Sequence, residues 1–119
     1  MVLVDTSVWV SHLRRGSGRL QSLLDEGAVV CHPFIIGELA CGQLKNREEI
    51  LALLQALPGA VQAEHDEVLR LIEDEKLMGT GLGYIDVHLL ASSLLTGASL
   101  WTLDKGLSAA AAKLGVGIS

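Results

Sequence analysis

The chain alternates short apolar, β-branched runs with longer segments whose apolar residues recur at helical spacing. Val2–Val4 and residues 28–31 are such short runs, and both are predicted to be buried strands. A third run, residues 99–103, follows a glycine that ends an apolar helix opening at Asp86. Strands that alternate with helices in this way predict a mostly parallel sheet covered by helices.

The predicted helices share apolar residues on one face or a clear stop signal such as glycine or proline. They cover residues 6–13, 19–26, 33–43, 46–57, 65–78, 86–96 and 105–114. Residues 60–63 and 116–118 are predicted as minor strands. We therefore expect an α/β fold, a three-layer sandwich with a central sheet flanked by helices, in a single domain of residues 1–119.

Composition and charge indicate the compartment of the protein and the kinds of partner that it can bind. No apolar run approaches the roughly 20 residues of a membrane span, so we expect no membrane segment. Cys31 and Cys41 stand apart without metal-binding spacing, which favours reduced thiols and a cytoplasmic location. A net charge of −5 argues against binding nucleic acid through bulk positive charge. That argument weakens if several acids are metal ligands.

Four acidic residues are candidates for a functional site. Asp5, Asp86 and Asp104 each precede or open a predicted helix, and helix capping is the ordinary explanation for each of them. Glu38 is different, because it is the only charge in an apolar helix. A buried, unpartnered carboxylate would cost several kcal/mol. Glu38 therefore either lies on an exposed seam, pairs with an arginine, or faces the same crevice as the aspartates.

The ends of parallel strands define where these acids would meet. Asp5 follows the first strand and Asp104 follows the run at residues 99–103, so both belong to the carboxyl edge of the sheet. Several ionised carboxylates at one place repel each other unless a cation joins them. Oxygen ligands favour Mg²⁺ or Mn²⁺, and such a site can activate water against a phosphodiester. The glycine-rich residues 79–83 follow a helix, which is the wrong context for a phosphate-binding loop.

Four segments, in order along the whole chain, resemble PIN-domain ribonucleases, and most closely the VapC toxins of bacterial toxin–antitoxin pairs. They are residues 2–9, 37–39, 85–91 and 100–107. The resemblance implies that Asp5, Glu38, Asp86 and Asp104 bind Mg²⁺ or Mn²⁺ in an endoribonuclease that prefers single-stranded RNA. It also implies a cognate VapB-like antitoxin and a homodimer.

The resemblance also suggests supporting residues around the acids. Thr6 and Thr102 match positions where a small hydroxyl supports the acids or the bound water. His88 matches the family pattern, but it lies two residues from Asp86 on another face of the helix and is interpreted as packing. Candidates for contacts with RNA phosphates lie one helix away from the first acid: Arg14, Arg15 and Arg19. A solvated helix end explains these arginines equally well.

Two other classes of protein fit parts of the same pattern. A phospho-acceptor receiver domain has similar length and plan, but it needs an acceptor aspartate after a mid-chain strand. This chain has no aspartate between Asp25 and Asp66. A non-catalytic binding module is the second alternative, with acids that only cap helices. Binding of Mn²⁺ that is lost on Asp5→Asn would separate the nuclease from that module.

Overall fold

Three short parallel strands form the centre of the computed structural model, which describes residues 1–118. They are β1 (Val2–Val4), β2 (Val29–Val30) and β3 (Ser99–Trp101), in the order β2-β1-β3. Val2 lies opposite Val29 on one side and opposite Ser99 on the other. The apolar, β-branched character of β1 and β2, whose residues are all buried, suits strands that are covered on both faces.

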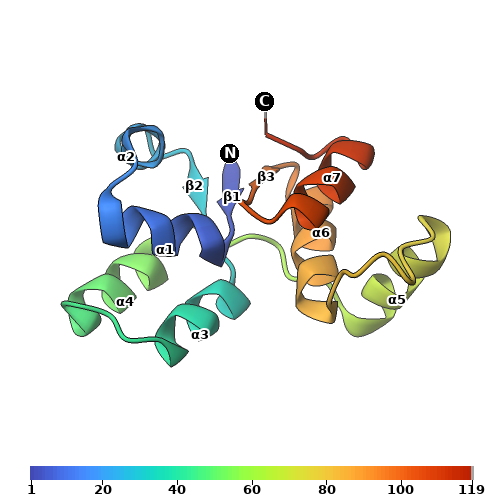
Figure 1. The fold of residues 1–119 in the computed structure, drawn as a ribbon, viewed down its shortest axis with the longest axis horizontal. Coiled ribbons are helices and arrows are strands. Elements are labelled where there is room, and N and C mark those ends of the chain that lie inside the picture. Colours follow the sequence, from blue (N-terminus) through green and yellow to red (C-terminus); the bar gives the residue numbers. More distant parts are fainter. Residues whose placement is uncertain (119) are drawn as a thin grey trace.

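Helices enclose the sheet on both sides. They are α1 (Thr6–Arg15), α2 (Gly18–Asp25), α3 (Pro33–Cys41), α4 (Arg47–Ala56), α5 (His65–Asp74), α6 (Tyr84–Thr96) and α7 (Lys105–Lys113). Figure 1 shows α1 to α4 on one side of the strands and α5 to α7 on the other. The predicted three-layer α/β sandwich is confirmed.

The core is built around β1 and α6. Leu3 and Val4 are completely shielded from solvent, as are Leu89 and Leu90 of α6. All residues from 87 to 93 are buried, so α6 is covered around most of its circumference. An apolar helix without a polar face is the pattern expected of such a central helix. None of the helices in the described part of the chain is long and apolar enough to cross a membrane.

Both predicted minor strands are wrong, because the first contributes no bridge to the sheet and the second contributes only one. Residues 60–63 form no strand, and the contact with the sheet is made just before them, at Gly59. Residues 116–118 add one bridge to β3, from Gly117. The backbone of Ala112 lies 3.2 Å from the place where a Cβ on Gly117 would stand. This tight approach favours a residue without a side chain at position 117.

The helix predicted over residues 65–78 also ends earlier than expected, at Asp74. Lys76 adopts a left-handed backbone with φ of 53°, and the Leu77 N–H donates to the Ile72 carbonyl at 2.9 Å. These features close the helix as a glycine would. The apolar pattern runs on because Leu77 is itself buried. Hydrophobic spacing alone therefore could not show this boundary.

The direction of α6 matters for the site. The helix precedes β3 and returns antiparallel to it, so its first residues lie at the edge where the parallel strands end. Figure 1 shows the N-terminal ends of α3 and α6 on the side of the molecule where the strands finish. The fold therefore brings segments from residues 5, 38, 86 and 104 to one edge of the sheet.

Candidate functional site

Asp5 directly follows β1 and is nearly buried, with 9% of its surface exposed. It occupies the N-cap position of α1, yet its side chain makes no capping hydrogen bond. Instead, its Oδ2 accepts hydrogen bonds from the hydroxyls of Ser7, at 2.8 Å, and Thr102, at 2.7 Å. Capping therefore does not explain Asp5. Its carboxylate is held by hydroxyl donors at the carboxyl end of the sheet.

The same two hydroxyls connect the ends of β1 and β3. The Ser7 Oγ accepts from the Leu103 N–H at 3.0 Å, and the Thr102 Oγ1 accepts from the Asp104 N–H at 3.1 Å. The two hydroxyl oxygens lie 3.4 Å apart. Sequence reasoning missed Ser7, and its place two residues after Asp5 was the available signal. Thr102 thus links Asp5 directly to the backbone of Asp104.

Asp104 has the capping role that Asp5 lacks. It is the N-cap of α7, and its Oδ2 accepts from the Leu107 N–H at 2.8 Å. The residue is exposed. A carboxylate has two oxygens with about four lone-pair sites, so one capping bond leaves acceptor capacity. Capping and metal binding are therefore compatible at Asp104.

Glu38 lies on the exposed side of α3 and does not bear the cost of burial. Its Oε1 accepts a hydrogen bond from the Thr6 hydroxyl at 2.9 Å, which ties α3 to the start of α1. Exposure rules out a buried carboxylate without a partner, and the alternative that Glu38 faces the same crevice as the aspartates stays a prediction. Glu38 and Thr6 also line a groove of about 600 Å³ between α1, α3 and α4, together with Arg14 and Lys45.

Asp86 is the third residue of α6 and is half-buried. Its Oδ2 accepts from the Gly83 N–H at 3.0 Å, so it satisfies a backbone donor that the start of the helix leaves open. This is a capping contact, although Gly83 and not Asp86 occupies the N-cap position. The carboxylate faces the end of α6 that lies at the carboxyl edge of the sheet.

The four acids share one edge of the sheet but do not form a closed ligand shell. Within residues 1–118, no group of three or more histidine, cysteine, aspartate or glutamate side chains is placed to hold a metal ion. The donor chemistry nevertheless suits a hard divalent cation, because each of the four side chains supplies carboxylate oxygens. Asp5 and Asp104 are linked through Thr102, whereas Glu38 and Asp86 are each tied to a different partner.

The three arginines proposed for substrate contacts lie in different places. Arg14 lines the groove beside Glu38, and Arg15 is exposed at the last residue of α1. Arg19 places its guanidinium over the ring of Trp101, 5.0 Å from the ring centre. Arg14 therefore shares a groove with one of the four acids, Glu38.

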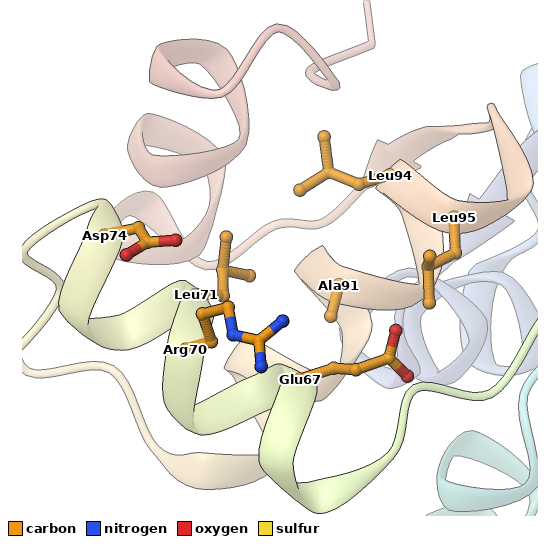
Figure 2. A pocket seen from close by; sticks show the side chains of 7 residues that line it. All are labelled: Glu67, Arg70, Leu71, Asp74, Ala91, Leu94 and Leu95. Atoms are coloured by element: carbon orange, nitrogen blue, oxygen red, sulfur yellow. The ribbon is translucent and has the colours of Figure 1, made fainter.

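A separate hollow of about 230 Å³ lies between α5 and α6. Figure 2 shows charged side chains of α5 at its rim and leucines of α6 opposite them. Its lining residues are Glu67, Arg70, Leu71, Asp74, Ala91, Leu94 and Leu95. None of the predicted site residues is among them, so this hollow is distinct from the acidic edge.

A cluster of rings, which we call the ring cluster, joins α3, α5 and α6 and was not foreseen from the sequence. It consists of His32, Phe34, His65, Tyr84 and His88. His88 is buried and packs edge-to-face against Phe34 and Tyr84, at 4.8 and 4.7 Å between ring centres. The interpretation of His88 as a packing residue agrees with this position.

Burial governs the protonation of the inner histidines. Loss of solvent around His32, followed by the nearby His88, lowers the pKa of His32 from 6.5 to about 4. Burial also lowers the pKa of His88, and His65 adds to that effect. The Nδ1 of His32 accepts from the Phe34 N–H at 3.0 Å, as the N-cap of α3. A neutral imidazole is needed for that acceptor role.

Comparison with known proteins shows the family to which this chain belongs. A family model of the PIN domain matches residues 2–113. Ribonuclease VapC32 of Mycobacterium tuberculosis, from strains CDC 1551 / Oshkosh and ATCC 25618 / H37Rv, is 49% identical to this chain over 120 residues, which cover 100% of this chain and 97% of the relative. The crystal structure of PAE2754 from Pyrobaculum aerophilum shares the fold, with a TM-score of 0.61 at 18% identity, over 91% of this chain and 77% of that one. The chain therefore belongs to the PIN-domain family, and within it to the VapC group.

Proposed function

We propose that this protein is a VapC-type toxin, an endoribonuclease that hydrolyses RNA phosphodiester bonds with Mg²⁺ or Mn²⁺ and is neutralised by a cognate antitoxin. The observation that carries the proposal is Asp5, a nearly buried carboxylate at a strand end that caps nothing and is fixed by two hydroxyls. Its relative at 49% identity is named a ribonuclease. The phospho-acceptor alternative is not favoured, because the chain belongs to the PIN-domain family.

The four acids would have different roles in binding the metal. Asp5 and Asp104, at the ends of β1 and β3, would hold the metal most directly, and Glu38 and Asp86 would complete the set. When bound, a divalent metal lowers the pKa of a coordinated water and stabilises the leaving oxygen of a phosphodiester. The chain itself supplies orientation, because a carboxylate held in place before binding loses less freedom when it takes a ligand.

The hydroxyls provide that orientation. Ser7 and Thr102 both donate to Oδ2 of Asp5, which leaves Oδ1 as the oxygen that we assign to the metal. Thr6 fixes Glu38 in the corresponding way from α1. Arg14, which lines the groove beside Glu38, is the best placed of the arginines for an RNA phosphate.

An antitoxin segment would inhibit the enzyme by covering the groove between α1, α3 and α4. The groove combines apolar residues such as Val10 and Leu39 with the carboxylate of Glu38. An arginine suits that arrangement, since its fork matches a carboxylate while its stem packs on apolar surface. If a complex left this groove and the four acids open and RNA was still cleaved, inhibition would work by another route.

We also propose a homodimer in the cytoplasm. Both cysteines are free thiols, which fits a reducing compartment. Leu69 of α5 and Leu94 and Leu95 of α6 are each more than 40% exposed, and the two α6 leucines line the hollow of Figure 2. A second copy of the chain would cover them. Light scattering should report a dimer for the parent and a monomer for Leu95→Glu, and an unchanged mass would place the interface elsewhere.

The metal requirement tests the proposed activity directly. The purified protein, free of antitoxin, should cleave single-stranded RNA with Mg²⁺ or Mn²⁺, lose activity in EDTA and regain it when metal is returned. Calorimetry should show Mn²⁺ binding to the parent protein. Robust cleavage in EDTA, with contaminating nucleases removed, would contradict the metal mechanism. A folded protein that binds no Mn²⁺ would favour the non-catalytic binding module.

A further inference from the structure

The ring cluster concentrates aromatic side chains that are scarce elsewhere in the chain. The sequence has one tyrosine, one phenylalanine and four histidines. The tyrosine, the phenylalanine and three of the histidines belong to this cluster. Most of these rings serve packing, because they touch one another between α3, α5 and α6. Two of the residues, His65 and Tyr84, are in addition exposed to solvent, and Tyr84 carries the larger aromatic ring.

Tyr84 is exposed but fixed in orientation. Its hydroxyl lies 2.7 Å from Nδ1 of His65 and 3.0 Å from Nε2 of His88. The His88 ring also meets it at 81°, with 4.7 Å between the ring centres. Even so, 43% of the Tyr84 surface is exposed. A side chain that is anchored at its tip and along one side can accept a partner with little further loss of conformational entropy.

The position of Tyr84 relates it to the acids. It is the first residue of α6, and Asp86 is the third, so both lie at the end of the helix that meets the carboxyl edge of the sheet (Figure 1). The cluster also reaches α3 through Phe34, which lies one turn before Glu38 on the same face of that helix. Tyr84 lies two residues before Asp86 and so on another face of the helix, but both stand in the first turn of α6.

We propose that Tyr84 is a stacking platform for a nucleobase of the single-stranded RNA substrate, held in position by His65 and His88. This inference rests on the proposed ribonuclease activity and adds a substrate contact to it. An unpaired base can stack on an aromatic ring, whereas a base inside a duplex cannot reach it. Stacking tolerates any base, because every base has a π-face.

The charge of the protein gives such a contact a clear purpose. With a net charge of −5, the chain gains little general attraction for the phosphate backbone. A fixed aromatic ring supplies affinity that does not depend on charge. It would also select single strands and hold them at the N-terminal end of α6, the end that carries Asp86. Support of the Tyr84 ring would be the role of the histidines and the phenylalanine that gather at this end of α6.

Equilibrium binding of an uncleavable probe tests the proposal. The probe is a single-stranded 2′-O-methyl RNA oligonucleotide that carries 2-aminopurine, whose fluorescence falls when the base stacks. Tyr84→Leu should weaken binding about 5- to 100-fold and abolish the fluorescence change. Tyr84→Phe should keep most of both, because it retains the ring. Leu53→Ala, at an exposed apolar residue of α4, should bind like the parent. In cleavage assays, Tyr84→Leu should raise KM much more than it lowers kcat.

The possible results separate this inference from the proposed function. A parent that cleaves RNA while Tyr84→Leu keeps its affinity and KM would overturn the stacking role alone. The same holds if Tyr84→Leu changes only the self-association of the protein, since the ring would then be a protein contact. A parent that neither binds nor cleaves RNA would overturn both proposals. If Tyr84→Leu does not fold, the parent still decides, because absence of any fluorescence change on binding contradicts stacking.

Discussion

The strand-borne and helix-borne acids of the candidate site are held in different ways. At the ends of β1 and β3, Asp5 and the backbone of Asp104 share a network of two hydroxyls, and Asp5 is nearly buried. On the helices, Glu38 is exposed with a hydrogen bond to Thr6, and Asp86 is half-buried with a bond to the start of its own helix.

We call Asp5 and Asp104 the strand half of the site, and Glu38 and Asp86 the helix half. The difference in how they are held suggests that the two halves contribute differently to stability and catalysis. A buried network has a large cost when one partner is removed, because the remaining polar groups lose their partners away from water. An exposed carboxylate can be replaced at little cost to folding. We therefore expect the strand half to be preorganised and the helix half to adjust when metal and RNA bind.

The largest effect should come from Asp5→Asn. This change keeps the shape and the acceptor oxygen of the side chain but removes the charge, and cleavage should fall by about 100-fold or more, a loss typical of a key electrostatic group. Single-turnover cleavage at saturating Mn²⁺ measures it, with circular dichroism to show that the variant is folded. Activity within tenfold of the parent would remove Asp5 from the centre of the mechanism.

Thr102 tests the preorganisation of the strand half. Thr102→Val keeps the shape but removes the hydroxyl that donates to Asp5 and accepts from the Asp104 N–H. The free energy of unfolding should fall by about 1–3 kcal/mol, as measured by urea denaturation. Thr102→Ser, which retains the hydroxyl, is the matched control and should lose less. If Thr102→Ser were destabilised and Thr102→Val were not, the methyl group and not the network would be the important feature.

A pH titration examines the support of the helix half. His32 caps α3, the helix that carries Glu38, and its pKa is lowered from 6.5 to about 4. The unfolded chain therefore binds a proton more readily than the folded one, so stability is complete above about pH 6.5 and declines as the pH falls toward 4. The loss between pH 7 and pH 5 should be about 2 kcal/mol.

The control for that titration is His32→Asn. Asparagine can accept the same hydrogen bond from the Phe34 N–H at the N-cap, but it does not titrate. The variant will be less stable overall because it loses ring packing, so the comparison concerns the slope of stability against pH. A slope equal to that of the parent would mean that other groups cause the acid sensitivity.

The strand half also shows how far the sequence alone could lead. The apolar runs and the acids that follow them predicted β1, β3 and the edge where Asp5 and Asp104 lie. The bonding of Asp5 could not be predicted, because Thr102 is 97 positions away and the register of β1 on β3 decides whether they meet. The capping role of Asp104 needed only its local neighbours and was foreseeable from the sequence.

The helix half was harder to predict for a different reason. The burial of a helix face depends on its neighbours, and the apolar surroundings of Glu38 suggested a cost of burial that its exposed position avoids. The ring cluster depends on packing among α3, α5 and α6, which residue spacing within one helix cannot show. The end of α5 depended on the backbone of Lys76, a local choice that hydrophobic spacing does not encode.

The smallest effect on stability, and the sharpest contrast with Thr102, should come from Glu38→Gln. The side chain is exposed, and glutamine can still accept from the Thr6 hydroxyl, so the free energy of unfolding should stay within about 0.5 kcal/mol of the parent. Cleavage should nevertheless fall about tenfold or more, because the variant lacks a charged metal ligand. Melting in the presence of Mn²⁺ provides the deciding measurement, since a ligand that binds only the folded state stabilises it according to its affinity. At the same Mn²⁺ concentration, the melting temperature of Glu38→Gln should rise less than that of the parent. The control is Glu49→Gln, which changes an exposed acid on α4, and its melting temperature should rise as much as that of the parent. An unchanged response to Mn²⁺ together with full activity would limit the role of Glu38 to its hydrogen bond with Thr6.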